Sequence, residues 1–171
     1  LGAGPAGCNT TSPQRDTEPD LMALGRADAP LALVEFSDYQ CPYCARFHAA
    51  VVPRLKTEYI DTGKLRLLFK DLPLAMHREA MPAARAARCA GAQGKFWQMN
   101  EALFANQARL GTDLYARLAQ ALALDIEQFK ACVGSPLTHQ RVLRDAGDAR
   151  RLGINSTPTF VLGRYDGERM Q

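Results

Sequence analysis

The feature that most constrains this fold is the stretch EFSDYQCPYCARFH, which puts two cysteines where a strand pattern gives way to a helix pattern. The preceding residues, PLALVEFS (30–37), form a short apolar run that is typical of a strand buried on both faces. From Pro42 the pattern is helical, and proline suits the first position of a helix. We therefore expect Cys41 to be the N-cap residue and Cys44 to lie one turn inside the helix.

This position predicts different chemistry for the two sulfurs. The free backbone N–H groups of Tyr43 and Cys44 can point back at the Cys41 sulfur, and the helix dipole also favours an anion there. Cys41 is thus the predicted nucleophile, whereas Cys44 is shielded and keeps a higher pKa. Residues three apart on a helix have Cα atoms about 5 Å apart, a spacing that a disulfide accepts. The pair can therefore cycle between dithiol and disulfide.

Glu35 lies on the predicted strand, six residues before the first cysteine. An isolated carboxylate is costly on a buried strand, so burial there favours the protonated form. Glu35 is therefore a candidate to relay a proton to or from Cys44 during exchange. The alternative is that Glu35 lies at the end of the sheet in contact with water.

Zinc binding is one alternative for the cysteine pair, because His48 follows Cys44 by one helical turn. A closed structural zinc site needs four ligands, however. Cys8 lies in an irregular segment, and Cys89 and Cys132 are far along the chain, so we expect no metal and no other cofactor. An inert structural disulfide is a further alternative, which the position at a helix N-terminus disfavours.

The remaining sequence predicts an α/β order. Residues 1–28 are rich in Gly, Pro, Ser and Thr and predict a tail or linker. GKLRLLFKDL (63–72) predicts a second strand, which would pair in parallel through a right-handed crossover. Residues 76–152 show repeated helical faces and no convincing strand. TPTFVLG (157–163) returns to strand character, and RYDGERM can complete a hairpin with it.

We therefore assign an α/β domain to residues 29–75 and 153–171, with an all-helical domain, 76–152, inserted between its halves. A sheet face needs cover, so we expect either a final helix beyond Gln171 or cover supplied by something else. The composition is globular, with 47% apolar and 23% charged residues, and the net charge of +3 is too small to favour a nucleic-acid partner. No apolar stretch approaches the length of a membrane span.

Thr157 and Pro158 form a second signal near the end of the chain. Pro158 stands at the entrance of the last predicted strand, where proline cannot join an interior ladder. A cis Thr157–Pro158 bond would turn the chain sharply. If this turn lies beside the cysteines, the Thr157 backbone is free to pair with an extended peptide.

The two signals together resemble the thioredoxin superfamily. The 112 residues between Cys44 and Thr157 are mostly helical, and a helical domain inserted in a thioredoxin fold is similar to the DsbA-like thiol:disulfide oxidoreductases of the bacterial cell envelope. The segments that carry the resemblance, which covers about residues 22–170, are DAPLALVEFSDYQCPYCARFH, AARCAGAQGKFWQMNEALF and LGINSTPTFVLG.

The resemblance implies a role for each matching residue. Cys41 matches the exposed attacking cysteine of the family, and Cys44 matches the buried resolving one. Pro158 matches the cis-proline, and Thr157 matches the residue before it, which contacts substrate. Glu35 matches the buried acid near the site.

The dipeptide between the cysteines departs from the best-known oxidants of the family, which have histidine at the position of Tyr43. CPYC is also the motif of glutaredoxins, so we expect a less extreme oxidant, with a potential of roughly −230 to −120 mV. Pro42 and Tyr43 are expected to border the substrate site.

The function implied by the resemblance is the introduction of disulfides into exported proteins in the bacterial periplasm or envelope. The expected partners are reduced or unfolded secreted proteins, and a membrane quinone-linked partner or a small disulfide would reoxidise the enzyme. A reductase or isomerase of the same fold is the first alternative. A metal-binding module that uses Cys41, Cys44 and His48 is the second.

Three cysteines remain. Some relatives have a disulfide within the inserted domain, so the resemblance makes Cys89 and Cys132 a candidate structural disulfide; buried free thiols or a redox-regulatory pair are the alternatives. Cys8 follows small residues, as at a bacterial lipoprotein cleavage site, although Pro5 stands where an aliphatic residue is usual. A lipid anchor at Cys8 is therefore one expectation, and a free thiol is the alternative.

Overall fold

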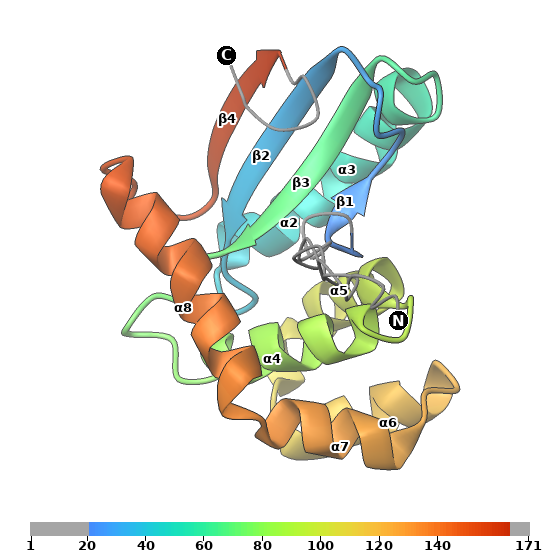
Figure 1. Cartoon of the computed structure of the whole chain (residues 1–171), viewed down its shortest axis with the longest axis vertical. Helices are drawn as coiled ribbons and strands as arrows, with labels where there is room; N and C mark the ends of the chain where they lie inside the picture. Colours follow the sequence, from blue (N-terminus) through green and yellow to red (C-terminus); the bar gives the residue numbers. More distant parts are fainter. Residues whose placement is uncertain (1–20, 165–171) are drawn as a thin grey trace, which may run out of the picture.

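The computed structural model describes residues 21–164, which are built around a four-stranded sheet with the order β1-β3-β2-β4 (Figure 1). The parallel pair β2 and β3 is flanked by β1 and β4, and both flanking strands run antiparallel to their neighbours. The strands are β1 Ala23–Leu24, β2 Leu31–Ser37, β3 Leu65–Asp71 and β4 Thr159–Arg164. The predicted α/β fold class is therefore confirmed. Cys8 and most of RYDGERM lie outside the described residues.

The helices occur where the sequence predicts them, with one break. The first helical segment is interrupted at Val51, two residues before Pro53, because proline lacks an N–H and clashes with the preceding turn. The helical elements are α2 Pro42–Ala50, α3 Val52–Leu55, the π-helical turn η1 Lys56–Ile60, α4 Ala80–Gly91, α5 Phe96–Ala105, the 3-10 turn η2 Gln107–Arg109, α6 Thr112–Ala121, α7 Ile126–Gly134 and α8 Pro136–Arg151. None of these helices, within the described residues, is both long and apolar enough to cross a bilayer.

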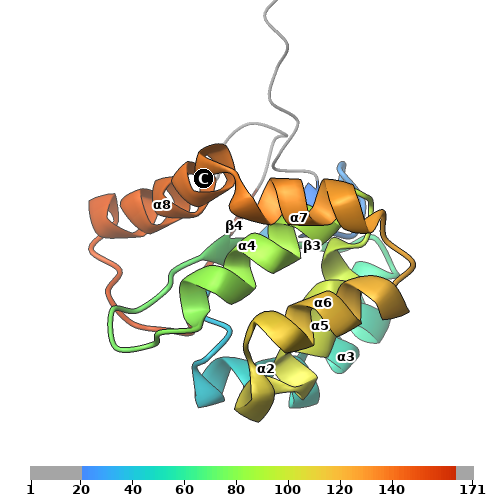
Figure 2. The same ribbon diagram turned by 90° about the horizontal axis from the view of Figure 1, so that it is seen from below.

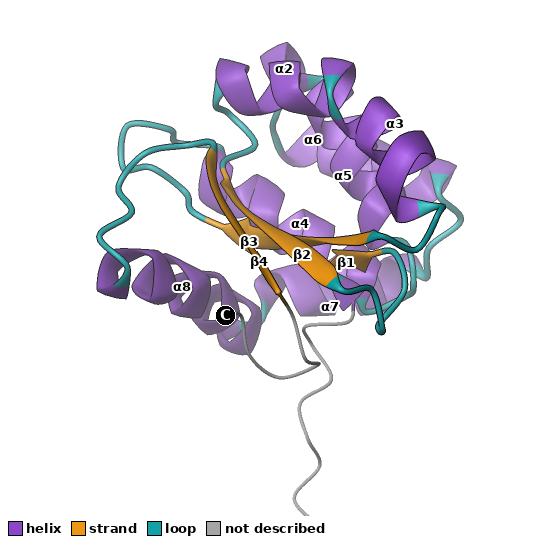
Figure 3. Ribbon diagram, turned by 90° about the horizontal axis from the view of Figure 1, so that it is seen from above, coloured by secondary structure: helices purple, strands orange, loops and turns teal. Residues whose placement is uncertain are grey.

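Helices cover both faces of the sheet, with α2, α3 and α5 on one side and α8 on the other (Figure 3). Side chains alternate along a strand, so β2 supplies both layers. Leu33 and Val52 of α3 pack against the same buried cluster, which includes Leu67 of β3, on the first face. Phe36 packs against Ala146 and Ala149 of α8 on the second face. Glu35 and Ser37 alternate with Phe36 and so belong to the first face, beneath α2.

The helical block packs directly on the sheet and shares its core. One apolar cluster joins Phe69 of β3 and Cys44 of α2 to Phe96 and Met99 of α5. Helix α4 lies in the middle of the helical block, with α7 and α8 on one side and α5 and α6 on the other (Figure 2). Its small side chains let neighbouring helices approach closely; the buried ones are Ala80, Ala83, Ala84, Ala86, Ala87 and Ala90.

A disulfide joins Cys89 of α4 to Cys132 of α7, so the candidate structural disulfide is confirmed. A buried ion-pair network joins α4 to the end of β3. Arg88 Nε donates to Asp71 at 2.6 Å, and the same guanidinium bonds Asp145 of α8. Burial raises the pKa of Asp71 to about 6, although the charge of Arg88 opposes this shift.

The tail predicted for residues 1–28 is too long. Residues 22–24 belong to the fold, since Met22 is buried, its carbonyl accepts the Phe69 N–H at 3.0 Å, and Ala23–Leu24 form β1. The Trp97 indole also donates to the Ala23 carbonyl at 2.8 Å. Strand β1 has only two residues, which is too short to produce a periodic pattern in the sequence.

Candidate active site

The start of α2 has the predicted local structure. Cys41 is the N-cap, with extended backbone angles, and Pro42 is the first helical residue. The turn before it is an Asx turn, in which the Asp38 carboxylate accepts the Gln40 N–H at 2.7 Å. The Cys41 carbonyl then accepts the Ala45 N–H at 3.2 Å, which begins the helix.

The Cys41 sulfur does not make the predicted contacts with the N–H groups of Tyr43 and Cys44. It caps no helix N–H, and its thiol instead donates to the Thr157 carbonyl at 3.4 Å. Cys41 is also buried, with only 4% exposed, whereas the resemblance implied an exposed thiol. A protonated thiol is a donor and therefore turns towards a carbonyl oxygen. The peptide bond from Thr157 to Pro158 is cis, and the carbonyl of this peptide unit is the one that accepts the Cys41 thiol.

Cys44 lies one turn deeper and is fully buried. Burial raises the pKa of its thiol to about 12, and the neighbouring Cys41 also raises it. The Ser37 hydroxyl and the backbone of Asp38 act against this shift. Ser37 Oγ is itself buried with no partner at ordinary hydrogen-bonding distance. Cys44 therefore remains a protonated thiol at neutral pH.

Glu35 is completely buried, so the alternative that water solvates it is wrong. Its two carboxylate oxygens lie 3.1 and 3.0 Å from Nε2 of His48. His48 comes from α2 and is held by ring stacking on Phe104 of α5, with centroids 4.1 Å apart. The sequence singled out both residues but did not pair them, because one lies on a strand and the other on a helix packed over it.

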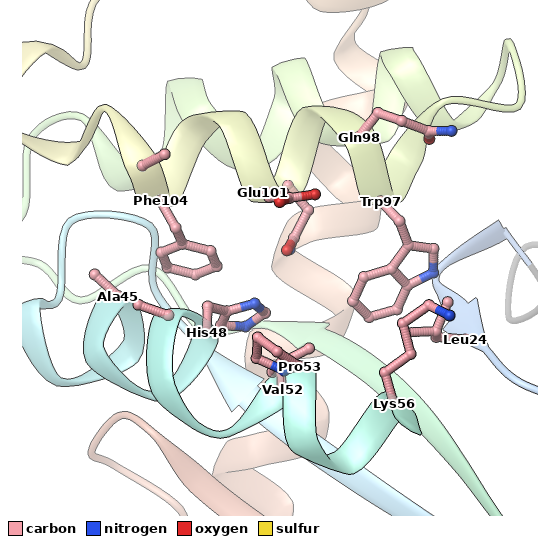
Figure 4. A pocket seen from close by; sticks show the side chains of 13 residues that line it. Leu24, Ala45, His48, Val52, Pro53, Lys56, Trp97, Gln98, Glu101 and Phe104 are labelled. Atoms are coloured by element: carbon pink, nitrogen blue, oxygen red, sulfur yellow. The ribbon is translucent and has the colours of Figure 1, made fainter. Parts of the chain in front are cut away.

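A cavity of about 540 Å³ lies between α5 and the helices α2 and α3, and His48 forms part of its wall (Figure 4). Most of the lining is apolar, including Phe104 and Trp97. Two charged side chains, Lys56 and Glu101, also line it. Water therefore has space to approach the His48 ring from the side of α5.

The residues that anchor the active-site turn were missed by the sequence analysis. The buried Asp38 accepts the Leu74 N–H at 2.8 Å and bonds the His77 ring at 2.8 Å. Gln107 of η2 donates to the backbone carbonyls of Tyr39 and Cys41, both at 2.8 Å. The Asp-x-Gln spacing indicates a turn, but its distant partners leave no mark near the cysteines in the sequence.

The other predicted site residues lie on the surface near the pair. Pro42 is exposed, and Tyr43 is 62% exposed, with the Arg46 guanidinium 5.3 Å from its ring centroid. The zinc ligand set is not assembled, since His48 faces Glu35. Within residues 21–164 no cluster of three or more His, Cys, Asp or Glu side chains is arranged to hold a metal.

Comparison with known proteins agrees with this geometry. The family model described as Thioredoxin matches residues 17–169. The probable disulfide bond formation protein D of Bacillus cereus is 32% identical over 150 residues, which cover 82% of this chain and 69% of that protein. The crystal structure of Wolbachia pipientis α-DsbA1 superposes with a TM-score of 0.78 at 27% identity and covers 88% of this chain and 78% of its own. The α/β fold with a helical insertion is thus a known architecture.

A further relative is a much longer protein. The Na⁺/H⁺ antiporter NhaA 1 of Mycobacterium sp. (strain KMS) is 44% identical over 143 residues, which cover 81% of this chain but 22% of the antiporter. The chain therefore spans about a fifth of the length of this curated relative.

Proposed function

Because the chain belongs to the thioredoxin family, in its DsbA-like branch, we propose that it is a thiol:disulfide exchange enzyme. Cys41 and Cys44 are the proposed redox pair. The observation that carries the proposal is the 3.4 Å contact between the Cys41 sulfur and the Thr157 carbonyl. It places a redox-capable sulfur against the backbone of a chain segment that is 116 residues away in sequence. An extended substrate that pairs with the Thr157 backbone would present its own sulfur to Cys41.

The reaction starts from a Cys41–Cys44 disulfide. A substrate thiolate attacks the Cys41 sulfur, the bond to Cys44 breaks, and Cys44 leaves and takes up a proton. A second thiolate of the substrate then attacks the substrate sulfur of the mixed disulfide and releases Cys41. The substrate loses two electrons and gains a disulfide, and the enzyme holds those electrons as two thiols. A membrane quinone-linked partner or a small disulfide accepts them in turn.

Glu35 serves this reaction as the proton donor and acceptor for Cys44. A thiol with a pKa of about 12 leaves slowly as an anion, so prompt protonation of Cys44 speeds its departure. Glu35 and Ser37 lie on the same face of β2, about 7 Å apart along the strand. The proposed route from Glu35 to Cys44 therefore needs one bridging water molecule. The Ser37 hydroxyl is next to Cys44 and completes the route.

The proposed direction is oxidation of reduced or unfolded exported proteins in the bacterial envelope. The relative from Bacillus cereus is named for disulfide bond formation, which supports this direction. The Cys89–Cys132 bond supports an extracytoplasmic location, because structural disulfides persist in oxidising compartments. Pro42 and Tyr43, exposed beside the sulfurs, are the proposed rim of the substrate site.

The redox potential of the Cys41–Cys44 pair tests the direction. Equilibration with glutathione buffers should give roughly −230 to −120 mV for an oxidant. A value near about −270 mV, as in thioredoxin, would instead favour the reductase alternative. The Cys41→Ser variant should be inactive in oxidative refolding of a reduced protein, and Cys44→Ser should accumulate mixed disulfides with it. Equal refolding rates for the wild type and the Cys41→Ser variant would refute the proposal.

A further inference from the structure

We propose that His48 is a positioning residue that fixes Glu35 and passes protons between Glu35 and water in the cavity beside α5. The inference deepens the proposed thiol exchange, because Glu35 serves Cys44 there. It rests on three observations about the described residues: the paired contacts of His48 with Glu35, the immobilised His48 ring, and the cavity on whose wall the ring lies.

The first observation is the pairing itself. The Glu35 side chain is entirely excluded from solvent, and the His48 side chain is 7% exposed. Both oxygens of the carboxylate lie within 3.1 Å of one ring nitrogen, Nε2. When Glu35 is ionised, Nε2 must carry the hydrogen, because a carboxylate only accepts hydrogen bonds. Each proton that enters or leaves Glu35 on this side therefore passes through the His48 ring.

The second observation is that aromatic neighbours hold the ring in place. Phe104 stacks on His48 with centroids 4.1 Å apart and an angle of 21° between the planes. Phe69 and Phe47 contact the ring edge-on, and their ring centroids lie 6.0 and 5.7 Å from that of His48. These contacts hinder rotation of the ring, so Nε2 stays on Glu35 and Nδ1 stays on the other side of the imidazole.

The third observation is the cavity between α5 and the helices α2 and α3. Figure 4 shows the His48 ring at its wall, below Phe104 and facing the space under Glu101. Nδ1 has no hydrogen-bond partner among residues 21–164. The cavity, of about 540 Å³, is large enough for several waters, each of which occupies about 30 Å³ in the liquid. A water molecule can therefore reach the nitrogen that Glu35 leaves free.

The proton balance of the step is simple and needs no other reactant. When Glu35 has given its proton to Cys44, Nε2 of His48 passes its hydrogen to the carboxylate while Nδ1 takes a proton from a cavity water. The substrate thiol releases a proton to the solvent when it forms the attacking thiolate, and this proton restores the water. Reversal of the same two transfers carries a proton out when Cys44 ionises. No electrons move and no heavy-atom bond forms or breaks.

Other titratable side chains within residues 21–164 lie near the pair. Cys44 precedes His48 by one turn of α2, and Tyr39 lies in the turn before that helix. The cavity adds Glu101 from α5 and Lys56 from η1, which carry opposite charges. The pH dependence of the wild type therefore reports several groups, and only a comparison between variants isolates His48.

The test compares His48→Gln, His48→Ala and the matched control His139→Gln, whose histidine lies on α8. The probe is the single-turnover rate at which a dithiol reduces the Cys41–Cys44 disulfide between pH 5 and 9. His48→Gln keeps an amide N–H for Glu35 but cannot pass a proton, so its rate should fall about tenfold or more and its pH profile should change. His139→Gln should match the wild type. Added imidazole should restore His48→Ala, where the ring leaves a space, but not His48→Gln.

A second readout separates this inference from the proposed function. Infrared spectroscopy of the Glu35 carboxyl in the substrate-free protein should show a displaced carboxyl band in folded His48→Gln, because the imidazole that contacts both oxygens is replaced by an amide. An active wild type, with unchanged rates and an unchanged carboxyl band in both folded variants, would overturn the role of His48 alone. A wild type without any thiol exchange would overturn both the inference and the proposed function.

Discussion

At the scale of single residues, the two sulfurs of the pair differ because one helical turn separates different environments. Cys41 lies at the helix start against the Thr157 carbonyl, and Cys44 lies in a fully buried position. Removal from water penalises the thiolate more than the thiol, which is why burial is the main cause of the raised pKa of Cys44. The raised pKa of Cys44 is therefore produced largely by its burial.

Alkylation of the Cys41→Ser variant tests this depth effect. The reaction of Cys44 with iodoacetamide should keep accelerating above pH 10, because burial places its pKa at about 12. In denaturant, the alkylation rate of the same variant should level off near pH 9, because the ordinary pKa of a cysteine thiol is 9.0. Mass spectrometry of quenched samples gives both rates. A plateau near pH 9 in the folded protein would contradict the burial argument.

The raised pKa of Cys44 also makes the stability of the reduced protein depend on pH. Between pH 9 and about 12 the unfolded Cys44 thiol has lost its proton while the folded thiol keeps it. The unfolded state then binds fewer protons, so the free energy of unfolding of the reduced protein should fall as pH rises through this window. Denaturant unfolding at pH 8 and pH 10 should show this loss for the reduced protein and not for the oxidised one. An equal change in both forms would assign the loss to other groups.

At the scale of elements, a buried charge network joins the end of β3 to α4 and α8. Arg88 forms ion pairs with both Asp71 and Asp145. The Asp145 carboxylate also accepts hydrogen bonds from the Lys70 ammonium at 2.7 Å and from the Asp71 N–H at 3.1 Å. A buried charge is tolerated only when partners replace its hydration. These three elements are therefore held in one arrangement behind the active-site turn.

Removal of the central cation should be severe. Arg88→Met leaves two buried carboxylates with insufficient compensation, so we expect a loss of about 3–5 kcal/mol in the free energy of unfolding. Arg54→Met is the matched control, because the Arg54–Glu58 pair is exposed, and it should change stability by less than about 0.5 kcal/mol. Urea unfolding of both variants is the measurement. Similar losses in the two would show that the network contributes no more than a surface pair.

The raised pKa of Asp71 predicts a second effect at this scale. Its pKa is about 6 in the folded protein and near 3.8 when unfolded, so the folded state binds more protons between these values. The contribution of Asp71 to stability should therefore fall as pH rises from about 4 to 6. Subtracting the Asp71→Asn unfolding curve from that of the wild type isolates this slope. Parallel curves would contradict it.

At the scale of the whole molecule, the helical block and the sheet form one core, and a disulfide reinforces the block. The Cys89–Cys132 bond closes a loop of 43 residues, for which loop-closure entropy predicts a stabilisation of about 4 kcal/mol. In a background with Cys41→Ser and Cys44→Ser, the further changes Cys89→Ser and Cys132→Ser should lower the free energy of unfolding by roughly this amount. A loss below about 1 kcal/mol would show that helix packing alone holds α4 and α7 together.

The sequence by itself determined the features that depend on neighbouring residues. Apolar runs predicted β2 and β3, and proline after cysteine predicted the N-cap at Cys41 and the start of α2 at Pro42. Each of these depends on backbone and side-chain interactions within a turn or a strand, so a short window of residues contains the information.

Only the tertiary structure decided which distant groups meet. It turned the Cys41 thiol to the Thr157 carbonyl and paired Glu35 with His48. It also bonded Asp38 to His77 and added Ala23–Leu24 to the sheet as β1. These pairings depend on how helices lie across a sheet, and a buried polar group takes whichever partner the packed chain brings within about 3 Å. Burial, the main cause of the raised Cys44 pKa, likewise exists only once the core has formed.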